Sequence, residues 1–265
     1  MNARINGIDL VFDQEGNGHP VLLIHGFPLN RHMWRPQVDA LTTAGYRVVT
    51  PDLRGFGDSP IGKIGSGGLD LLADDLVALL DHLEIDQAVI GGMSMGGYIL
   101  LNLLARHPDR IRAACLLVTR ANADDETARA KRDHLIGEVE AGNPIAVADA
   151  FIQVLFAEGT ATARPELVAE THRWLAATSP AGLLFGLRAI RDRVDSTRLL
   201  PGFNRQTLVI GAELDQTIPV ERSRDLAAGI PDAELVLIPA AGHMANLERP
   251  EAFNQALLEF LSKVF

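Results

Sequence analysis

One serine in this sequence stands where a nucleophile could be exposed. Ser94 lies in the run Gly91-Gly92-Met93-Ser94-Met95-Gly96-Gly97, directly after an apolar stretch that ends near Ile90 and directly before a helical pattern. A strand that turns into a helix within a few residues crowds its neighbours, and glycines on both sides of the serine relieve that crowding. The short Gly-x-Ser-x-Gly spacing also occurs by chance, so its position between strand and helix carries the interpretation of an exposed, reactive hydroxyl.

A serine hydroxyl needs a base to remove its proton, and the base needs an acid to orient it. Of the eight histidines, His243 is the best candidate because it closely follows the apolar run from Leu235 to Ile238. Asp215 follows another such run, Thr207 to Ile210, and is our candidate for the acid. Glu213, two residues earlier, is the alternative carboxylate, and the choice between the two stays open at this point. Apolar runs are typical of buried parallel strands, whose ends lie at one sheet edge, so these side chains can meet the serine there.

Backbone N–H groups are a second requirement, because negative charge develops on a carbonyl oxygen that a serine attacks. The first candidate is the N–H of Met95, at the start of the predicted helix, where amides have no partner within the helix. The second is the N–H of Phe27 in the loop His25-Gly26-Phe27-Pro28, which follows the apolar run Val21 to Ile24. His25 has the chemistry of a base, but we interpret it as a residue that braces this loop.

Together these four signals resemble the α/β-hydrolase family, and the resemblance extends over nearly the whole chain. The family has the chain order serine, acid and histidine, which Ser94, Asp215 and His243 match. The loop from Pro51 to Ser59 is also similar, and its charges are expected to hold the loop together. Within the family, the segments around Trp34, Ser94 and His243 look closest to bacterial carboxylesterases, enol-lactonases of aromatic degradation and cofactor-free haloperoxidase-like esterases. The resemblance implies hydrolysis of carboxylic esters or lactones through an acyl-serine intermediate.

Two other functions are compatible with the same residues. Certain plant hormone receptors and bacterial stress regulators look like this fold with an intact triad and act as ligand-gated signalling receptors. Perhydrolysis, as in haloperoxidase-like enzymes, would use the same acyl-serine with peroxide in place of water. Epoxide hydrolases and haloalkane dehalogenases, in contrast, carry aspartate where this chain has Ser94, which argues against both.

The elements that must position these residues follow an alternation of strands and helices. Short apolar runs predict strands, and apolar residues every three or four positions predict helices. With an N-terminal hairpin, this alternation predicts an α/β fold with a doubly wound, mostly parallel sheet, to which the family resemblance adds the expectation of eight strands. The predicted strands cover residues 21–24, 47–50, 88–90, 116–118, 207–210 and 235–238, and the predicted helices cover 36–43, 69–83, 95–106, 220–228 and 250–261.

The alternation stops between about Ala121 and Arg198, where the chain is rich in Ala, Leu, Arg and Glu and has no convincing strand. We interpret residues 121–198 as a helical cap inserted in a core domain that consists of residues 1–120 and 199–265. Most apolar cap residues are expected to pack the cap helices together, and a minority to cover the site.

A pocket between cap and core would hold the substrate. Our candidates for its walls are Trp34, Phe151 and Trp174, and a pocket of this kind favours small to medium, largely apolar substrates. A substrate carboxylate, as in a lactone acid, would need a cation, for which Arg120, Arg129 and Arg188 are the candidates. Exposure to solvent is the alternative for each of these arginines.

Composition argues against several classes of partner. The 265 residues carry 34 acidic and 24 basic side chains, for a formal charge of −10, and no basic block opposes this charge. Such a chain repels nucleic acid and anionic membranes, and no apolar run reaches the ~18 residues that span a bilayer. The lone Cys115 and the absence of a signal-like N-terminus lead us to expect a cytoplasmic protein. No dinucleotide fingerprint or His-Glu-x-x-His motif occurs, so we expect neither cofactor nor metal, and the oligomeric state stays open.

Overall fold

Residues 1–64 and 67–265 are described by a computed structural model of the chain. Within them, eight strands form one sheet in the order β1-β2-β4-β3-β5-β6-β7-β8. β2 pairs antiparallel with β1 and with β4, and every other neighbouring pair is parallel. This arrangement confirms the predicted mostly parallel α/β fold. The strands are β1 (Asn2–Ile5), β2 (Ile8–Glu15), β3 (Pro20–Ile24), β4 (Arg47–Pro51), β5 (Ala88–Met93), β6 (Ile111–Leu117), β7 (Thr207–Ala212) and β8 (Glu234–Ile238).

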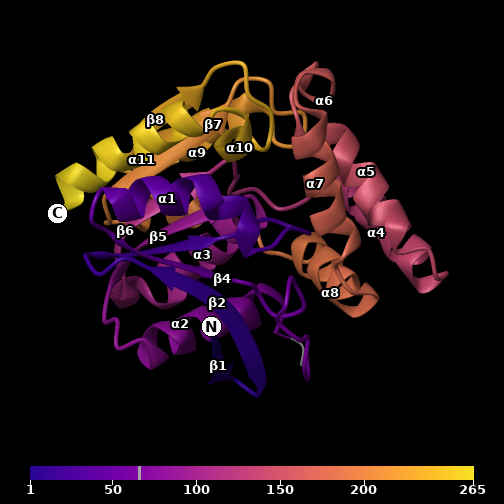
Figure 1. Cartoon of the computed structure of the whole chain (residues 1–265), viewed down its shortest axis with the longest axis horizontal. Helices are drawn as coiled ribbons and strands as arrows, with labels where there is room; N and C mark the ends of the chain where they lie inside the picture. The colour runs from indigo at the N-terminus through magenta and orange to yellow at the C-terminus, as the bar shows by residue number, and fades with distance from the viewer. Residues whose placement is uncertain (65–66) are drawn as a thin grey trace.

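Helices lie on both sides of this sheet, with α1 and α11 on one side and α2 on the other (Figure 1). The helices are α1 (Arg35–Thr43), α2 (Gly68–His82), α3 (Met95–Arg106), α4 (Glu126–Glu140), α5 (Ile145–Leu155), α6 (Thr160–Ala163), α7 (Pro165–Ala176), α8 (Pro180–Arg191), α9 (Val220–Gly229), α10 (Ala245–Glu248) and α11 (Pro250–Val264). The described residues also form the short 3-10 helices η1 (Arg31–Trp34), η2 (Pro108–Arg110) and η3 (Thr197–Gly202). None of the helices in the described chain is long and apolar enough to cross a membrane.

The central strands are buried, as their apolar sequences require. All six residues of β5 and all six of β7 are buried, because sheet neighbours lie on both edges and helices cover the faces. β5 is three residues longer than its apolar run predicts, since Gly91 and Gly92 continue the pairing with β3 and β6, and Met93 continues the pairing with β6. Glycine is rare in strands, but two flanking ladders hold it here.

The parallel strands end at one edge of the sheet, and this edge carries the predicted chemistry. Ser94 follows β5 and Phe27 follows β3, while Asp215 follows β7 and His243 follows β8. The sheet order places β3 beside β5 and β7 beside β8, with β6 between the two pairs. At this edge Ser94 and Phe27 therefore follow neighbouring strands, and so do Asp215 and His243.

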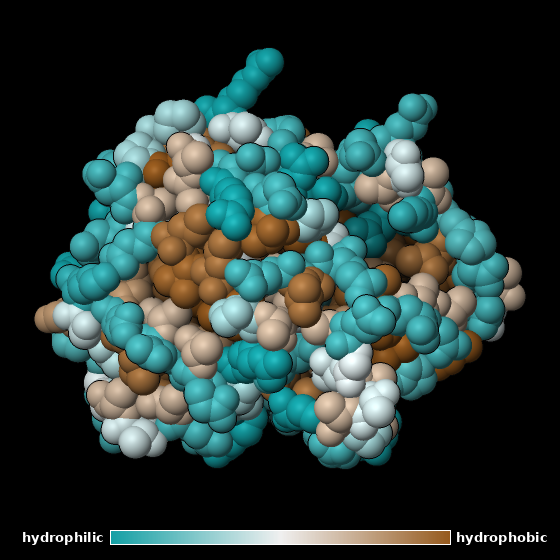
Figure 2. Space-filling model, turned by 90° about the horizontal axis from the view of Figure 1, so that it is seen from above, coloured by the Kyte–Doolittle hydropathy of each residue, from teal (hydrophilic) through white to brown (hydrophobic). Residues whose placement is uncertain are grey.

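The segment interpreted as a cap is helical. Helices α4 to α8 all lie between β6 and β7 in the chain, and residues 121–198, every one of which the structure describes, contain no strand. α4 packs against α5 and α8, and α5 packs against α7. In Figure 1 these helices stand together to the right of the sheet. Seen from above, hydrophobic residues gather in a hollow on this side of the molecule (Figure 2).

The charged loop after β4 is held by partners within the core. Arg54 is fully buried and donates two hydrogen bonds to Asp75, each 2.7 Å long. Asp52 accepts the backbone N–H groups of Arg31 and Asp58, both at 2.8 Å. These charges stabilise the loop, as the sequence led us to expect.

Candidate active site

Ser94 sits on a strained turn between β5 and α3. Its backbone has φ 54° and ψ −113°, a conformation that residues other than glycine rarely adopt. The turn closes because two glycines have no side chain: a Cβ on Gly92 would lie 2.2 Å from the carbonyl oxygen of Gly96, and a Cβ on Gly96 would lie 2.3 Å from that of Ile24. Both contacts are far below van der Waals distance, so this turn requires glycine at both positions.

The backbone of Ser94 is anchored while its side chain is available. Its N–H donates to the carbonyl oxygen of Leu117 at 3.0 Å, and its carbonyl oxygen accepts the hydroxyl of Thr119 at 2.8 Å. Among the residues that the structure describes, the Ser94 hydroxyl has no hydrogen-bond partner, and the residue is partly exposed. The Ser94 hydroxyl is therefore available to a ligand bound at this edge of the sheet.

His243 and Asp215 form a buried pair. Nδ1 of His243 lies 2.7 Å from Oδ2 of Asp215. The other carboxylate oxygen, Oδ1, accepts the backbone N–H groups of Thr217 at 2.7 Å and Ile218 at 2.9 Å. A carboxylate that is fixed in this way keeps the proton of the imidazole on Nδ1 and leaves Nε2 as the basic nitrogen.

Glu213, the rival acid, points elsewhere. Its side chain is exposed, and its backbone N–H donates to the carbonyl oxygen of Ile238 at 3.1 Å. The structure therefore brings Asp215, rather than Glu213, to His243.

The loop after β3 lies directly against the serine. A Cβ on Gly26 would be only 3.3 Å from the Cβ of Ser94. Within the described part of the chain, neither the N–H of Phe27 nor that of Met95 donates a hydrogen bond. Met95 follows Ser94 in the chain and Phe27 follows Gly26, so both amides lie on segments that border the serine.

His25 braces this loop, as its position suggested. Its Nε2 lies 3.0 Å from the backbone N of Leu53, and its Nδ1 lies 2.8 Å from the carbonyl oxygen of Gly26. An amide N–H can only donate and a carbonyl oxygen can only accept, so Nε2 accepts and Nδ1 carries the proton. Burial lowers the pKa of His25, although the charge of Asp52 opposes that shift. The ring is a neutral bridge between two loops.

The other reactive residue types give no competing site. Burial raises the pKa of the Cys115 thiol, which keeps it protonated and unreactive inside β6. Among the described residues, no group of three or more His, Cys, Asp and Glu side chains is arranged to hold a metal ion.

Glu248 is a site residue that sequence reasoning missed. Its Oε2 accepts the N–H of Gly242, next to His243, at 2.6 Å. Its Oε1 accepts the N–H of Ala157 at 2.9 Å and the hydroxyl of Thr160 at 2.6 Å. The side chain is buried, so one carboxylate links the loop that carries His243 to the cap. In the sequence, Glu248 is simply an acidic residue shortly after His243, and this position predicts no particular hydrogen-bond partner.

A cavity of about 870 Å³ lies between α4, α5 and the loop that follows β7. Phe151 lines it, and the Phe151 ring centroid lies 5.3 Å from that of Phe27. Gln216 and Thr217, the two residues after Asp215, form another part of its wall. The cavity therefore borders the loop that carries Asp215, and the Phe151 ring in its wall packs against Phe27.

Two of the three candidates for pocket walls lie elsewhere. Trp34 has no exposed surface and packs near Phe253 of α11, with ring centroids 6.5 Å apart, so it belongs to the core. Trp174 is half-buried on α7, packs against the apolar core and does not line the cavity beside Phe151. Trp34 is therefore a core residue, and Trp174 lies outside the cavity that Phe151 lines.

The three candidate arginines also separate. Arg129 pairs with Asp192 and Arg188 pairs with Glu140, and about half of each arginine side chain is exposed. Of the three candidates, Arg120 lines the cavity. The basic residues Lys131, Arg132 and His134 line it as well. These basic side chains border a cavity whose wall is otherwise largely apolar, as the cap sequence predicted.

A parallel sheet, a serine on a strained strand-to-helix turn and a buried acid–histidine pair define the class of the protein. The chain belongs to the α/β-hydrolase family, because the family model described as alpha/beta hydrolase fold matches residues 19–250.

Solved structures and curated relatives narrow the comparison. A thermophilic esterase from Thermogutta terrifontis has a TM-score of 0.94 and 36% identity, covering 100% of this chain and 98% of its own. The enol-lactonase from Burkholderia xenovorans LB400 has a TM-score of 0.91 and 30% identity, covering 99% and 100%. A non-heme chloroperoxidase of Kitasatospora aureofaciens is 30% identical over 284 residues, which cover 97% of this chain and 98% of that protein.

Proposed function

We propose that this protein hydrolyses small carboxylic esters or lactones through an acyl intermediate on Ser94. The observation that carries the proposal is the buried pair of His243 and Asp215, 2.7 Å apart, at the sheet edge that also holds the strained serine. The similarity to an esterase and an enol-lactonase over nearly full length supports the same reaction class.

In the first step, Nε2 of His243 takes the proton of the Ser94 hydroxyl as its oxygen attacks the carbonyl carbon of the ester. Negative charge moves to the carbonyl oxygen, where the N–H groups of Phe27 and Met95 stabilise it. Asp215 stabilises the imidazolium that forms. His243 then gives its proton to the leaving alcohol, and the acyl group stays on Ser94.

The second step reverses these roles. His243 removes a proton from water, the resulting hydroxide equivalent attacks the acyl carbonyl, and the same two N–H groups stabilise the charge. Collapse of the intermediate releases the carboxylic acid and returns the proton to Ser94. A lactone follows the same course, except that the leaving alcohol remains attached to the acid.

A turnover assay tests this proposal. We expect the purified protein alone to release p-nitrophenol from p-nitrophenyl acetate and butyrate over many turnovers, much faster than from the palmitate, and to leave casein intact. A single slow turnover with a change of conformation would contradict catalysis and favour a receptor. Faster cleavage of the palmitate would contradict a preference for small acyl groups.

Perhydrolysis is a second candidate, because one relative is a non-heme chloroperoxidase. Peroxide would attack the acyl-serine in place of water and release a peracid, which oxidises halide without a metal. Bromination of monochlorodimedone that requires acetate, peroxide and Ser94 would support it. Bromination that persists in the Ser94→Ala variant would contradict it.

A further inference from the structure

A buried threonine lies against the turn that carries Ser94. Thr119 comes two residues after the end of β6, and only 1% of its surface is exposed. Its hydroxyl donates to the carbonyl oxygen of Ser94 at 2.8 Å. Neither the sequence motifs nor the reaction proposed above assigns this hydroxyl a role.

The Ser94 carbonyl oxygen does not need the hydroxyl to be satisfied. It also accepts the backbone N–H groups of Gly97 at 2.9 Å and Tyr98 at 3.2 Å, which belong to the first turn of α3. A carbonyl oxygen has two lone pairs, so these two amides already satisfy it. The Thr119 hydroxyl is therefore an additional donor, which the helix itself does not require.

A glycine makes room for this contact. A Cβ on Gly97 would lie 2.3 Å from Oγ1 and 2.5 Å from the Cβ of Thr119. Both distances are far below van der Waals contact, so position 97 must be glycine for Thr119 to reach the Ser94 carbonyl. The last glycine of the run around Ser94 thus admits Thr119, whereas Gly92 and Gly96 close the turn itself.

The residue before the threonine is strained. Val118 has φ 39° although it is β-branched and buried, and such residues rarely adopt a positive φ. Its N–H donates to the carbonyl oxygen of Ile210 in β7 at 2.7 Å, which holds the strained residue in the sheet. Backbone strain of this kind concentrates at functional sites, where the surrounding structure maintains it. The strain at Val118 therefore points to a function for the side chain that follows it.

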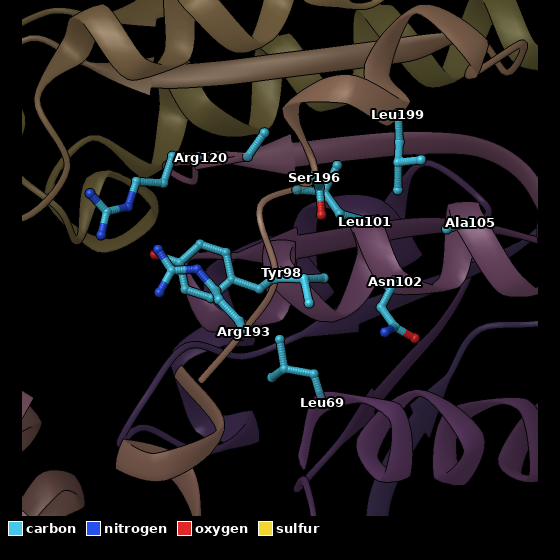
Figure 3. A pocket seen from close by; sticks show the side chains of 11 residues that line it. Leu69, Tyr98, Leu101, Asn102, Ala105, Arg120, Arg193, Ser196 and Leu199 are labelled. Atoms are coloured by element: carbon cyan, nitrogen blue, oxygen red, sulfur yellow. The ribbon is translucent and has the colours of Figure 1, made fainter. Parts of the chain in front are cut away.

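The segments on both sides of the contact are anchored as well. The guanidinium carbon of Arg193 lies 4.2 Å from the centre of the Tyr98 ring, which covers the first turn of α3 (Figure 3). Arg120, directly after Thr119, extends away from Tyr98 in the same view and donates to Asp124. Neither segment is free to shift, so the Thr119 hydroxyl is held at the Ser94 carbonyl.

The peptide group that accepts this hydrogen bond is the one between Ser94 and Met95. Its carbonyl oxygen belongs to Ser94, its N–H belongs to Met95, and the group is planar. Holding the oxygen therefore also sets the direction of the N–H. A hydrogen bond to the carbonyl polarises the amide, which makes the N–H a stronger donor. In the proposed reaction, this N–H stabilises the negative charge on the ester carbonyl oxygen.

We propose that Thr119 is a positioning residue, whose hydroxyl orients and strengthens the Met95 N–H by holding the Ser94 carbonyl oxygen. This proposal rests on the proposed function, and Thr119 acts through the peptide group without touching the substrate. The charged oxygen exists only after the serine has begun to attack. The contribution of Thr119 should therefore appear in kcat and leave KM unchanged.

The experiment compares Thr119→Ala with Thr119→Ser. Both variants lack the threonine methyl group and differ only in the hydroxyl, so their difference isolates the hydrogen bond. Loss of a whole oxyanion donor costs about 10²- to 10³-fold in kcat, and weakening one donor costs only part of that. With p-nitrophenyl butyrate at pH 7.5, Thr119→Ala should lower kcat by about three- to tenfold and keep KM within about twofold. Thr119→Ser should keep kcat within about twofold of the natural protein.

Two further measurements separate positioning from folding. The number of active sites is counted from the p-nitrophenol that diethyl p-nitrophenyl phosphate releases, so that kcat refers to folded, reactive protein. 1,1,1-Trifluoropentan-2-one, which has the carbon chain of the butyryl group, forms a tetrahedral adduct with a serine and bears a charged oxygen. Its inhibition constant should rise in Thr119→Ala by the factor by which kcat/KM falls, and should stay nearly unchanged in Thr119→Ser. A purely structural role would move neither quantity.

Thr171→Ala is the matched control. Thr171 is fully buried on α7, and its hydroxyl has no hydrogen-bond partner among the described residues. The control should leave kcat per active site and the inhibition constant unchanged. If Thr119→Ala does not fold, Thr119→Val takes its place in the comparison with Thr119→Ser, because valine keeps the volume and lacks the hydroxyl. Its kcat should fall by at least about threefold.

An unchanged kcat per active site in Thr119→Ala would overturn the positioning role. Equal losses in Thr119→Ala and Thr119→Ser would overturn it as well, and so would a lower kcat without weaker binding of the trifluoromethyl ketone. Failure of the natural protein to cleave any ester, including p-nitrophenyl acetate, would contradict the proposed function itself and the role of Thr119 with it.

Discussion

Ser94 and His243 lie at the same edge of the sheet, but different kinds of contact hold them. Ser94 is fixed by close packing: its turn requires glycine at positions 92 and 96 and is bonded to the neighbouring strand β6. His243 is fixed by hydrogen bonds that reach other parts of the chain. Asp215 orients its ring, and Glu248 joins its loop to the cap.

The same contrast extends to the neighbouring residues. The N–H of Met244 donates to the carbonyl oxygen of Leu155 at the end of α5, and the hydroxyl of Thr217 donates to that of Val154. The loops after β7 and β8 therefore depend on where the cap lies, whereas the turn after β5 depends on the sheet. Substitutions at the serine should act on chemistry alone, and substitutions on the histidine side should also act through the cap.

The largest expected effect is at the proposed nucleophile. Ser94→Ala should lower ester turnover by on the order of 10⁴- to 10⁶-fold, because the proposed acyl intermediate forms on the Ser94 oxygen. Thermal unfolding should change little, since the hydroxyl has no partner in the described chain. Ser262→Ala, at an exposed serine of α11, is the control. A Ser94→Ala protein that keeps a tenth of the activity would rule out the assignment.

The next effect separates the two acids on the histidine side. Asp215→Asn should reduce kcat by about 10⁴-fold, because the amide favours the wrong imidazole tautomer and removes the charge that stabilises the imidazolium. Glu213→Gln, at an exposed side chain, should leave kcat within about twofold. Comparable losses in steady-state assays of the two variants would show that the pair at 2.7 Å is not the working one.

Glu248→Gln tests the link between the histidine loop and the cap. The carboxylate of Glu248 accepts hydrogen bonds with both of its oxygens, whereas an amide has only one acceptor oxygen. In Glu248→Gln a buried N–H therefore loses its partner, which lowers the free energy of unfolding by about 1–3 kcal/mol. We expect kcat/KM to fall about tenfold and the melting temperature to fall by about 2–5 °C.

A purely structural role for Glu248 would leave the pH profile of kcat/KM unmoved. If Glu248 positions His243, the acidic limb of that profile should shift in Glu248→Gln, because the environment of the ring changes. Glu251→Gln, at an exposed position of α11, should shift neither the profile nor the melting temperature. An unshifted profile in both variants would contradict the positioning role.

The smallest expected effect concerns the serine side, through His25. Burial lowers its pKa in the folded protein, so below the ordinary value of ~6.5 the unfolded chain binds a proton that the folded chain does not. The stability that His25 contributes is therefore complete above pH ~6.5 and declines as the pH falls below it.

Urea unfolding at several pH values between 8 and 5 measures this contribution. The difference in free energy of unfolding between the natural protein and His25→Gln should be largest above pH 7 and should shrink toward pH 5. His82→Gln, at an exposed histidine of α2, controls for the substitution itself. A difference for His25→Gln that does not change with pH would contradict its buried, neutral bridge.

Local sequence predicted the elements that position the serine. The apolar runs and helical spacing identified the strands and helices of the sheet, because burial on both faces imposes a continuous apolar pattern. The glycines around Ser94 predicted the tight turn, because such a turn leaves no room for side chains beside the serine. Asp215 and His243 followed from their places after strands.

Contacts that depend on the cap could not be predicted in this way. Large aromatic side chains such as Trp34 and Trp174 can either pack against helices or line a pocket. Only the packing of the folded chain decides between the two. The link that Glu248 makes to the cap depends on contacts with Ala157 and Thr160, which lie 91 and 88 positions away in the chain. No periodicity in the sequence encodes such contacts.

Covalent labelling tests the central claim most directly. Diethyl p-nitrophenyl phosphate reacts with an activated serine and should release one p-nitrophenol per chain while ester turnover falls in proportion. Peptide mass spectrometry should then find the diethyl phosphoryl group on Ser94, and Asp215→Asn should react far more slowly. Loss of activity with the label on another residue, or full activity after complete labelling of Ser94, would contradict an acyl-serine mechanism at this site.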